Sequence, residues 1–297
     1  TINGQTISTS NTQGKNLIIN GAFTIAQRGT TSTSSGMHTV DRMNLVHSGT
    51  DEAPTQAQVD VSSGTTPYSL GFRKAFKVTN GNQTSGAGAA DYIQYEQGIE
   101  AQFAHNFGWD STSSSSNITM SFWIKSSVAR TFQGSLRATD SSKIYNWNTG
   151  ALSADTWTKV TKTIPGASGV TINNDNGLGL QWLLWPYLGT NYTGGGTSDA
   201  WKDHDSNDWA ASTDDTTWYT TDNATCDITG LQIELGSSAT SFDHEPIDVT
   251  LHKCRRYYQV IVTGGGDRFG TGGYYSSSGV QFPFQFNPRM RAAPTID

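Results

Sequence analysis

The sequence predicts an all-β fold, an antiparallel β-sandwich. Only 15% of the 297 residues are charged against 34% hydrophobic, and Gly, Ser, Thr, Asn and Asp are plentiful, which favours turn-rich β structure over helix. Short apolar runs recur with turn residues between them, a spacing typical of sandwiches. The runs are 16–27, 72–78, 91–99, 118–127, 157–164, 177–185 and 226–235.

Two of these runs predict side-chain facing in detail. In 118–127, the alternating residues Ile118, Met120, Phe122 and Ile124 indicate one buried face, with Trp123 on the opposite, polar face. In 226–235, the apolar residues shift from even to odd positions after Gly230. One inserted residue reverses facing, so the shift predicts a β-bulge near Thr229 and Gly230.

The character of the chain changes after Pro246. Leu251, Cys254, Arg255 and Tyr258 follow a helical spacing and predict one short helix. Beyond it, 257–262 and 279–288 are typical of strands, and so few strands cannot close a core. We therefore divide the chain into an N-terminal arm (1–14), a sandwich (15–246), and a helix with a β appendage (247–297) that belongs to an oligomerisation region or a longer C-terminal domain.

Composition excludes several classes of function. The net charge is -6 and the chain has no run of Lys or Arg, so we expect no nucleic-acid partner. Its most apolar run, 178–189, is too short to cross a bilayer, so we expect no membrane insertion. The two cysteines, Cys226 and Cys254, are too sparse for a disulfide scaffold and are expected to be reduced and buried.

The stretch DHDSND at 203–208 has the opening rhythm of a calcium loop. Asp203, Asp205, Asn207 and Asp214 match ligand positions of a helix-loop-helix site, but Asp208 stands where glycine is needed and the flanks lack helical periodicity. Two interpretations remain, an irregular calcium site in a loop and a solvated polar turn.

Aromatic residues gather in the same part of the chain. Flat rings stack on the C–H faces of sugars while neighbouring Asp and Asn bind hydroxyls, so the group predicts contact with a glycan or a neighbouring subunit. Its candidate members are Trp201, Trp209, Asp203, Asp205, Tyr192 and Trp218. The alternative is that the rings fill the core, which we expect for Trp182 and Trp185.

Evidence for catalysis in the sequence is thin. The six histidines belong to no hydrolase or metalloprotease motif, and paired acids such as Asp214 and Asp215 are common on any Asp-rich surface. We therefore expect no catalytic residues, no cofactor apart from the open calcium question, and no enzyme activity.

Several segments together resemble a family of bacteriophage tail-fibre-like virion proteins. They are NLIINGAFTIAQRGT (16–30), TVDRM (39–43), TMSFWIKSS (119–127), TWTKVTKTIPG (156–166), NDNGLGLQWLL (174–184), ITGLQIELGSSATSFDHEP (228–246) and CRRYYQ (254–259). The chain departs from the family pattern at Met43, where Trp is usual.

The resemblance implies a jelly-roll sandwich similar to carbohydrate-binding modules, followed by a helix and a β region. It implies a virion protein of the phage tail or capsid exterior, most simply a fibre-like adhesin for the host surface. It also implies a homotrimer whose partners are other virion proteins and a host glycan. The alternatives are a capsid decoration or tail connector protein and a polysaccharide-degrading tailspike enzyme. Such modules often hold a structural calcium, for which Asn20, Asp227 or Asp243 are candidates by analogy.

Overall fold

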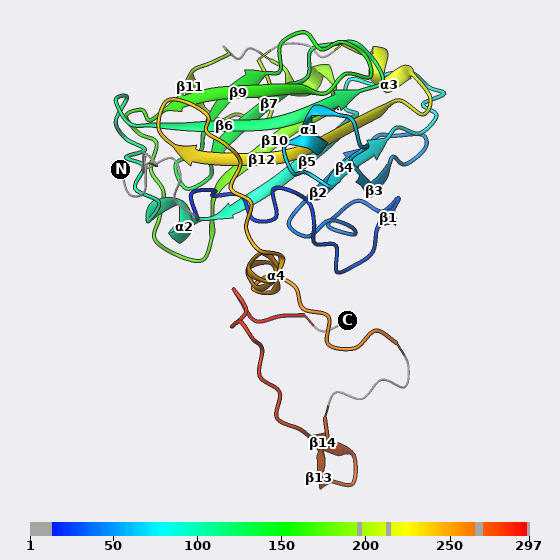
Figure 1. Ribbon diagram of the computed structural model, residues 1–297, viewed down its shortest axis with the longest axis vertical. Coiled ribbons are helices and arrows are strands. Elements are labelled where there is room, and N and C mark those ends of the chain that lie inside the picture. The colour runs from blue at the N-terminus through cyan, green and yellow to red at the C-terminus, as the bar shows by residue number, and fades with distance from the viewer. Residues whose placement is uncertain (1–13, 195–197, 212–214, 265–269, 296–297) are drawn as a thin grey trace.

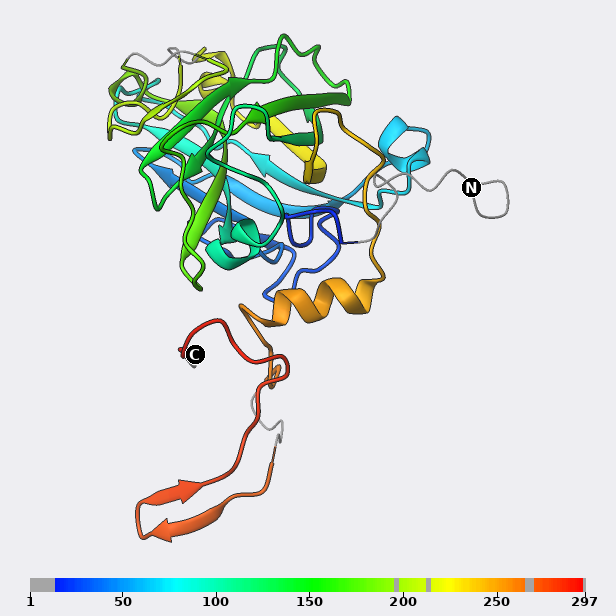
Figure 2. The same ribbon diagram turned by 90° about the vertical axis from the view of Figure 1, so that its left-hand side faces the viewer.

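The computed structural model describes residues 14–194, 198–211, 215–264 and 270–295. Two six-stranded antiparallel sheets pack face to face above a short helix and a projecting hairpin (Figures 1 and 2). This confirms the predicted all-β jelly-roll sandwich with a helix and a small C-terminal β region. Apart from Gly14, the predicted N-terminal arm lies outside the described residues, and so does Asp214.

The first sheet has the strand order β1-β3-β4-β12-β6-β9. Its strands are β1 (Thr31–Ser32), β3 (Thr55–Asp60), β4 (Lys74–Thr79), β12 (Thr225–Leu235), β6 (Asn117–Ser126) and β9 (Thr158–Pro165). The second sheet has the order β11-β8-β7-β10-β5-β2. Its strands are β11 (Trp201–Asp203), β8 (Lys143–Asn148), β7 (Gln133–Ala138), β10 (Leu178–Leu188), β5 (Tyr92–Glu100) and β2 (Asn44–Ser48).

Short helices punctuate the loops and one longer helix follows the sandwich. The short ones are α1 (Thr66–Ser69), α2 (Ala101–His105), α3 (Thr217–Thr220) and the 3-10 turn η2 (Thr190–Tyr192). The helix α4 (Ile247–Arg255) confirms the helix predicted after Pro246. No helix in the described part of the chain is both long and apolar enough to span a bilayer.

Both detailed facing predictions are confirmed. Ile118, Met120, Phe122 and Ile124 are fully buried in the main core, while Trp123 packs on the outer side of the sheet against a smaller cluster. In β12 the register with β6 shifts between Thr229 and Gln232. Cys226 and Ile228 before the shift, and Leu231 and Ile233 after it, face the core, whereas Leu235 at the end of the strand is exposed. Gly230 occupies the bulge with φ +65°, and a Cβ there would lie 2.6 Å from the ring of Phe72.

The prediction that residues 16–27 form a strand is wrong. This run forms turns in which Asn20 and Phe23 have positive φ values, because the Asn20 side chain bonds the backbone of Ile25 and Asp41. Gly21 lies so close to β12 that a Cβ would be 2.0 Å from the carbonyl oxygen of Leu231. Side-chain hydrogen bonds and this close approach therefore override the strand propensity of the apolar residues.

A buried carboxylate, Glu100 at the end of β5, ties the chain after α4 to the sandwich. It accepts hydrogen bonds from Nε and Nη2 of Arg256, at 3.0 and 2.6 Å, and from the hydroxyl of Tyr257 at 2.8 Å. The Arg42 guanidinium lies 3.6 Å from the centre of the Tyr257 ring. We call these four residues the Glu100 cluster. It explains two of the family-like segments, since Arg42 lies in TVDRM and Arg256 and Tyr257 lie in CRRYYQ.

The C-terminal appendage, described at residues 257–264 and 270–295, carries a hairpin that projects away from the sandwich (Figures 1 and 2), while near its end Arg291 exchanges hydrogen bonds with Asn176. It holds one hairpin, β13 (Gly273–Ser276) with β14 (Gly279–Gln281). Its base is closed where Gln259 donates to the Pro288 carbonyl and the Arg291 amide donates to the Arg256 carbonyl. The strands predicted at 257–262 and beyond Gln281 are wrong, because the described structure forms no strand at these positions.

Replacing Glu100 by glutamine should loosen the attachment of α4. We expect Glu100→Gln to lower the free energy of unfolding by about 2 kcal/mol at neutral pH, since Arg256 keeps only a neutral acceptor. Burial alone would raise the pKa of Glu100, but hydrogen bonds from Arg256, Tyr257 and Gln102 outweigh it and lower that pKa. The stabilisation is therefore present above the ordinary pKa of a glutamate and is lost as the pH falls through the lowered value.

Urea denaturation at a series of pH values measures this difference between wild type and variant. The control is Asp60→Asn, which removes an exposed ion pair with Lys74 and should change stability by less than about 0.5 kcal/mol. An effect of Glu100→Gln that is absent at neutral pH, or the same at every pH, contradicts the role given to the carboxylate.

Candidate functional site

The second sheet turns one face to the core and the other outward. Tyr95, Leu136 and Trp182 are buried in the core, and the residues between them point the other way because side chains alternate along a strand. The strand register sets these outward residues in rows across the sheet. One row is Asn44, Glu96, Leu183, Ser135 and Asn146, and the next is Gly98, Gln181, Arg137, Ile144 and Lys202. We call this surface the outer face.

A loop between β10 and α3 covers part of the outer face. We call its described residues, 189–194 and 198–211, the covering loop. Leu183 and Trp185 of β10 are buried against it in a small cluster separate from the main core. In this cluster, Ala210, Tyr192 and Trp209 come from the covering loop, and Tyr92 comes from β5. An apolar contact on the solvent side of β10 thus holds the loop onto the sheet.

Trp209 is the centre of that contact. Its ring meets the edge of Trp185 at 6.4 Å and the ring of His204 at 4.3 Å, and the Arg137 guanidinium lies 5.3 Å from its centre. Its Nε1 donates to the carbonyl of Ser206. Trp209 therefore joins the loop to the polar rows of the sheet, and it remains partly exposed.

Beside and beneath the loop, the outer face carries buried polar atoms with unused hydrogen-bonding capacity. Gln133, Ser135 and Gln181 are each more than nine-tenths buried. Buried polar atoms are nearly always satisfied, so a group of them without partners within the described chain is a place where a bridging water or a ligand would supply the missing hydrogen bonds. These atoms are Asn44 Oδ1, Gln133 Oε1, Ser135 Oγ, Arg137 Nε, Gln181 Oε1, His204 Nε2 and Asp208 Oδ1.

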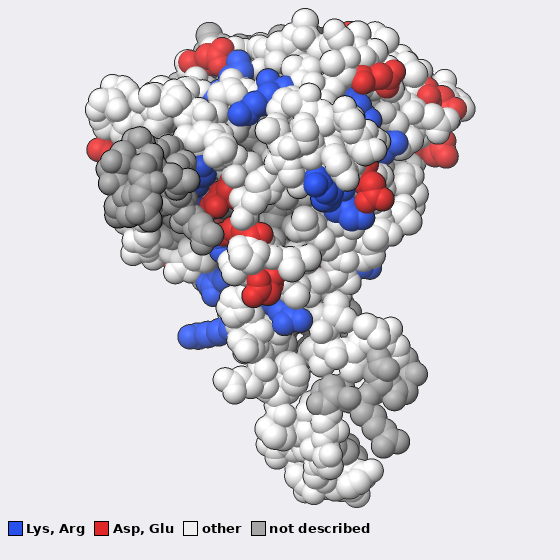
Figure 3. Space-filling view, viewed as in Figure 1, with Lys and Arg blue, Asp and Glu red and all other residues white. Residues whose placement is uncertain are grey.

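The charges around the outer face are balanced. Burial lowers the pKa of Arg137, and the nearby Glu96 carboxylate acts against this. Burial and the charge of Arg137 lower the pKa of His204, which keeps its ring neutral at pH 7. Lys202 pairs with Asp208 within the covering loop. On the face of the molecule in view in Figure 3, charges of both signs are likewise interspersed.

Two of the predicted contact residues, Trp209 and Tyr192, lie in the covering loop. Tyr192 packs its ring edge-on against Tyr92 at 5.7 Å and donates to the carbonyl of Ala90. Both rings are half-buried rather than displayed. They border the outer face and hold the loop in place.

The polar candidates of the same loop point outward. Asp203 is exposed and pairs with Lys143 at 2.7 Å, and Asp205 accepts from the backbone amide of Asn207 at 2.9 Å. This last contact is the hydrogen bond of a polar turn, as one of the two sequence interpretations expected. Within the described residues, no three His, Cys, Asp or Glu side chains gather as a metal site would require.

The structure separates the other two predicted tryptophans from the loop surface. Trp218 is fully buried and donates to the carbonyl of Thr225, so it cannot stack on a ligand, and we withdraw it as a contact residue. Trp201 turns toward the core, where it stacks near Trp109 and donates to the carbonyl of Pro165 at 2.7 Å. Both rings are packed in or against the apolar core between the sheets.

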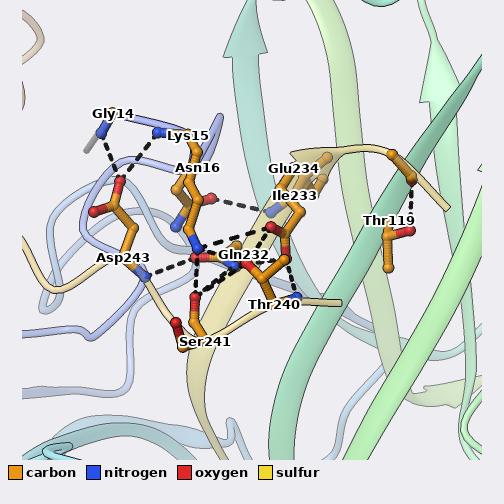
Figure 4. Close-up of polar contacts among 11 residues, drawn as sticks. Gly14, Lys15, Asn16, Thr119, Gln232, Ile233, Glu234, Thr240, Ser241 and Asp243 are labelled. Carbon is orange, nitrogen blue, oxygen red and sulfur yellow. Dashed lines mark hydrogen bonds and ion pairs between the residues drawn. The ribbon is translucent and has the colours of Figure 1, made fainter. Parts of the chain in front are cut away.

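The calcium candidates named by analogy lie in separate local networks. Asp243 accepts from the backbone amides of Gly14 and Lys15, at 2.7 and 3.1 Å (Figure 4). Asp227 pairs with Lys125 at 2.9 Å, and Asn20 bonds the backbone of its own turn. Each side chain already has a structural partner, so the three do not form one ligand set.

No protein-family model matches the chain, and no curated protein matches it. Among solved structures it is similar to the enzymatically active domain of bacteriophage CBA120 tailspike protein 4, with 12% identity, a TM-score of 0.39 and coverage of 75% of this chain and 22% of that one. It is similar to a CBM22 xylan-binding domain from Paenibacillus barcinonensis, with 10% identity, a TM-score of 0.34 and coverage of 76% and 98%. A CBM4 structure matches with 13% identity, a TM-score of 0.31 and coverage of 65% and 94%.

Similarity at this level assigns no ligand and no activity to this chain. Its match spans about a fifth of the tailspike chain.

Sequence reasoning missed the polar rows of the sheet. Asn44, Glu96, Arg137 and Gln181 come from four different strands and are brought together only by the strand register. The alternation of polar residues at 94 and 96, and at 133, 135 and 137, was the available signal. It marks an outward face but does not reveal which strands share it.

Proposed function

We propose that this protein is an attachment protein on the exterior of a bacteriophage virion, in the tail or on the capsid, and that it binds a host-surface glycan on the outer face. The virion role rests on the resemblance of its sequence segments to tail-fibre-like proteins. The glycan role rests on one observation of the structure, the polar atoms of the outer face that have unused hydrogen-bonding capacity.

Sugar hydroxyls fit this surface chemically. Each hydroxyl donates one hydrogen bond and accepts others, and the outer face offers acceptors such as Asn44 Oδ1 and Gln181 Oε1 beside the donor Arg137 Nε. The partly exposed edge of Trp209 gives an apolar border for the C–H groups of a sugar ring. All of these atoms have almost no exposed surface, so a sugar reaches them through bridging waters.

The proposed role is binding without cleavage. Glycoside hydrolysis requires two carboxyl groups on opposite sides of the scissile bond, one as acid and one as base or nucleophile. On β2, β5, β10, β7 and β8 the outward acidic residues are Glu96 and Glu100. The Glu96 carboxylate accepts from Gln94 at 3.0 Å, and the Glu100 carboxylate is engaged by Arg256 and Tyr257. In the covering loop, the carboxylate of Asp208 forms an ion pair with Lys202.

A second candidate function, a capsid decoration or tail connector, is favoured by the C-terminal appendage. Tyr274 and Tyr275 are 83% and 73% exposed, and a hairpin of this size is not stable in water on its own. Apart from Asp267 and Arg268, residues 257–288 carry no charged side chain. Such a segment suits contact with other copies of the chain or with other virion proteins.

We expect Arg137→Ala to weaken glycan binding by about tenfold or more, since a charge-assisted hydrogen bond contributes on the order of 1.5–3 kcal/mol. A glycan array finds the ligand and titration calorimetry measures its affinity for both proteins. Arg73→Ala is the control, because Arg73 is an exposed cation beside the first sheet, stacked on Tyr68. An array without any bound glycan contradicts the attachment role, and equal losses in both variants contradict the assignment to the outer face.

We also expect the chain to assemble as a homotrimer through the appendage. Sedimentation equilibrium of the full chain should give three times the monomer mass, and replacing Tyr274 and Tyr275 by serine should shift it toward the monomer without lowering the stability of the sandwich. A monomer at every concentration up to the solubility limit would contradict the trimer.

A further inference from the structure

We infer that the outer face selects a neutral, hydroxyl-rich sugar and discriminates against acidic ones. The inference deepens the proposed function and rests on it, because it names the class of glycan that the same site takes. It follows from how the cations and the unused polar atoms of the outer face are arranged.

The cation Lys202 of the outer face already has a carboxylate partner. It is paired with Asp208, and both side chains are mostly buried. An acidic sugar would have to displace this carboxylate from Lys202, and the exchange of one anion for another contributes little binding energy.

Arg137 is the remaining cation in the rows, and it is screened on two sides. The strand register puts Glu96 of β5 on the same face as Arg137 of β7, with β10 between them, and the Glu96 carboxylate acts electrostatically on the guanidinium. The ring of Trp209 lies along its guanidinium at 5.3 Å. An anion that approached Arg137 would also approach Glu96, so the attraction and the repulsion offset each other.

Two unused atoms of this surface can act only as acceptors, because the other polar atom of each side chain is already engaged. The amide nitrogen of Asn44 is directed at Glu96, which leaves Asn44 Oδ1 as an acceptor. Lys202 binds Asp208 through Oδ2, which leaves Oδ1 as an acceptor. A hydroxyl can donate to such oxygens, whereas a carboxylate or sulfate group has no proton to donate and is repelled. The arrangement therefore fits neutral sugars and opposes acidic ones.

The test compares two sets of oligosaccharides on the full-length chain. The neutral set contains hexasaccharides of glucose, mannose, galactose and xylose, and the acidic set contains oligogalacturonate, sialylated and sulfated oligosaccharides. We expect the neutral set to contain the ligand and the acidic set to bind at least about tenfold more weakly. Binding of the neutral ligand should change less than about twofold between low and high salt, because no net charge is neutralised.

The variant Glu96→Gln removes the anion beside Arg137. We expect it to raise affinity for the acidic set by about tenfold, the effect of one unscreened charge-assisted bond, while Asp60→Asn, which removes the same charge from the first sheet, leaves both sets unchanged.

Each outcome decides a specific claim. A preference for acidic glycans that weakens steeply with salt overturns the inference and leaves glycan attachment standing. Binding of neutral glycans without any gain for acidic ones in Glu96→Gln also overturns the part assigned to Glu96 and Arg137. Silence of both sets overturns the proposed function, and the inference with it.

Discussion

The buried carboxylate of Glu234, near the end of β12, holds together the segments on which the rest of the structure depends. It is 2% exposed and accepts hydrogen bonds from the backbone amide of Thr240, at 2.8 Å, and from the Thr240 hydroxyl (Figure 4). Gln232, two residues earlier on the same side of β12, accepts from the amide of Asp243 at 2.8 Å. Asp243 in turn bonds the backbone of Gly14 and Lys15.

This network joins three parts of the chain that are remote in sequence. The first described segment, the strand β12 between β4 and β6, and the segment that leads to α4 meet in one polar cluster on the outer side of the first sheet. A polar network of this kind is stable only when its members are satisfied, which explains why the residues that supply it occur together in ITGLQIELGSSATSFDHEP. This cluster lies on the first sheet, so it takes no part in the outer face of the second sheet.

The core and the inner faces of the strands could be predicted from sequence, and the site only in part. The alternation in 118–127 and the reversal of facing at Gly230 in 226–235 are local patterns, so they can be recognised without knowing which strands pair. The run 16–27 has the same apolar character, but contacts with distant residues such as Leu231 turn it into a series of bends. The covering loop was found through Trp209 and Tyr192, although their rings pack inward. Glu96, Arg137 and Gln181 could not be grouped, because the register that aligns them is set by pairing among β5, β10 and β7.

The central claim is that the outer face of the second sheet holds the ligand, and amide chemical-shift mapping by NMR during titration with the bound oligosaccharide tests it most directly. The shifts are expected to concentrate at Asn44, Glu96, Arg137, Gln181 and Trp209, which belong to four strands and the covering loop and share one surface. Shifts confined to the first sheet, or to the appendage beyond α4, would contradict it.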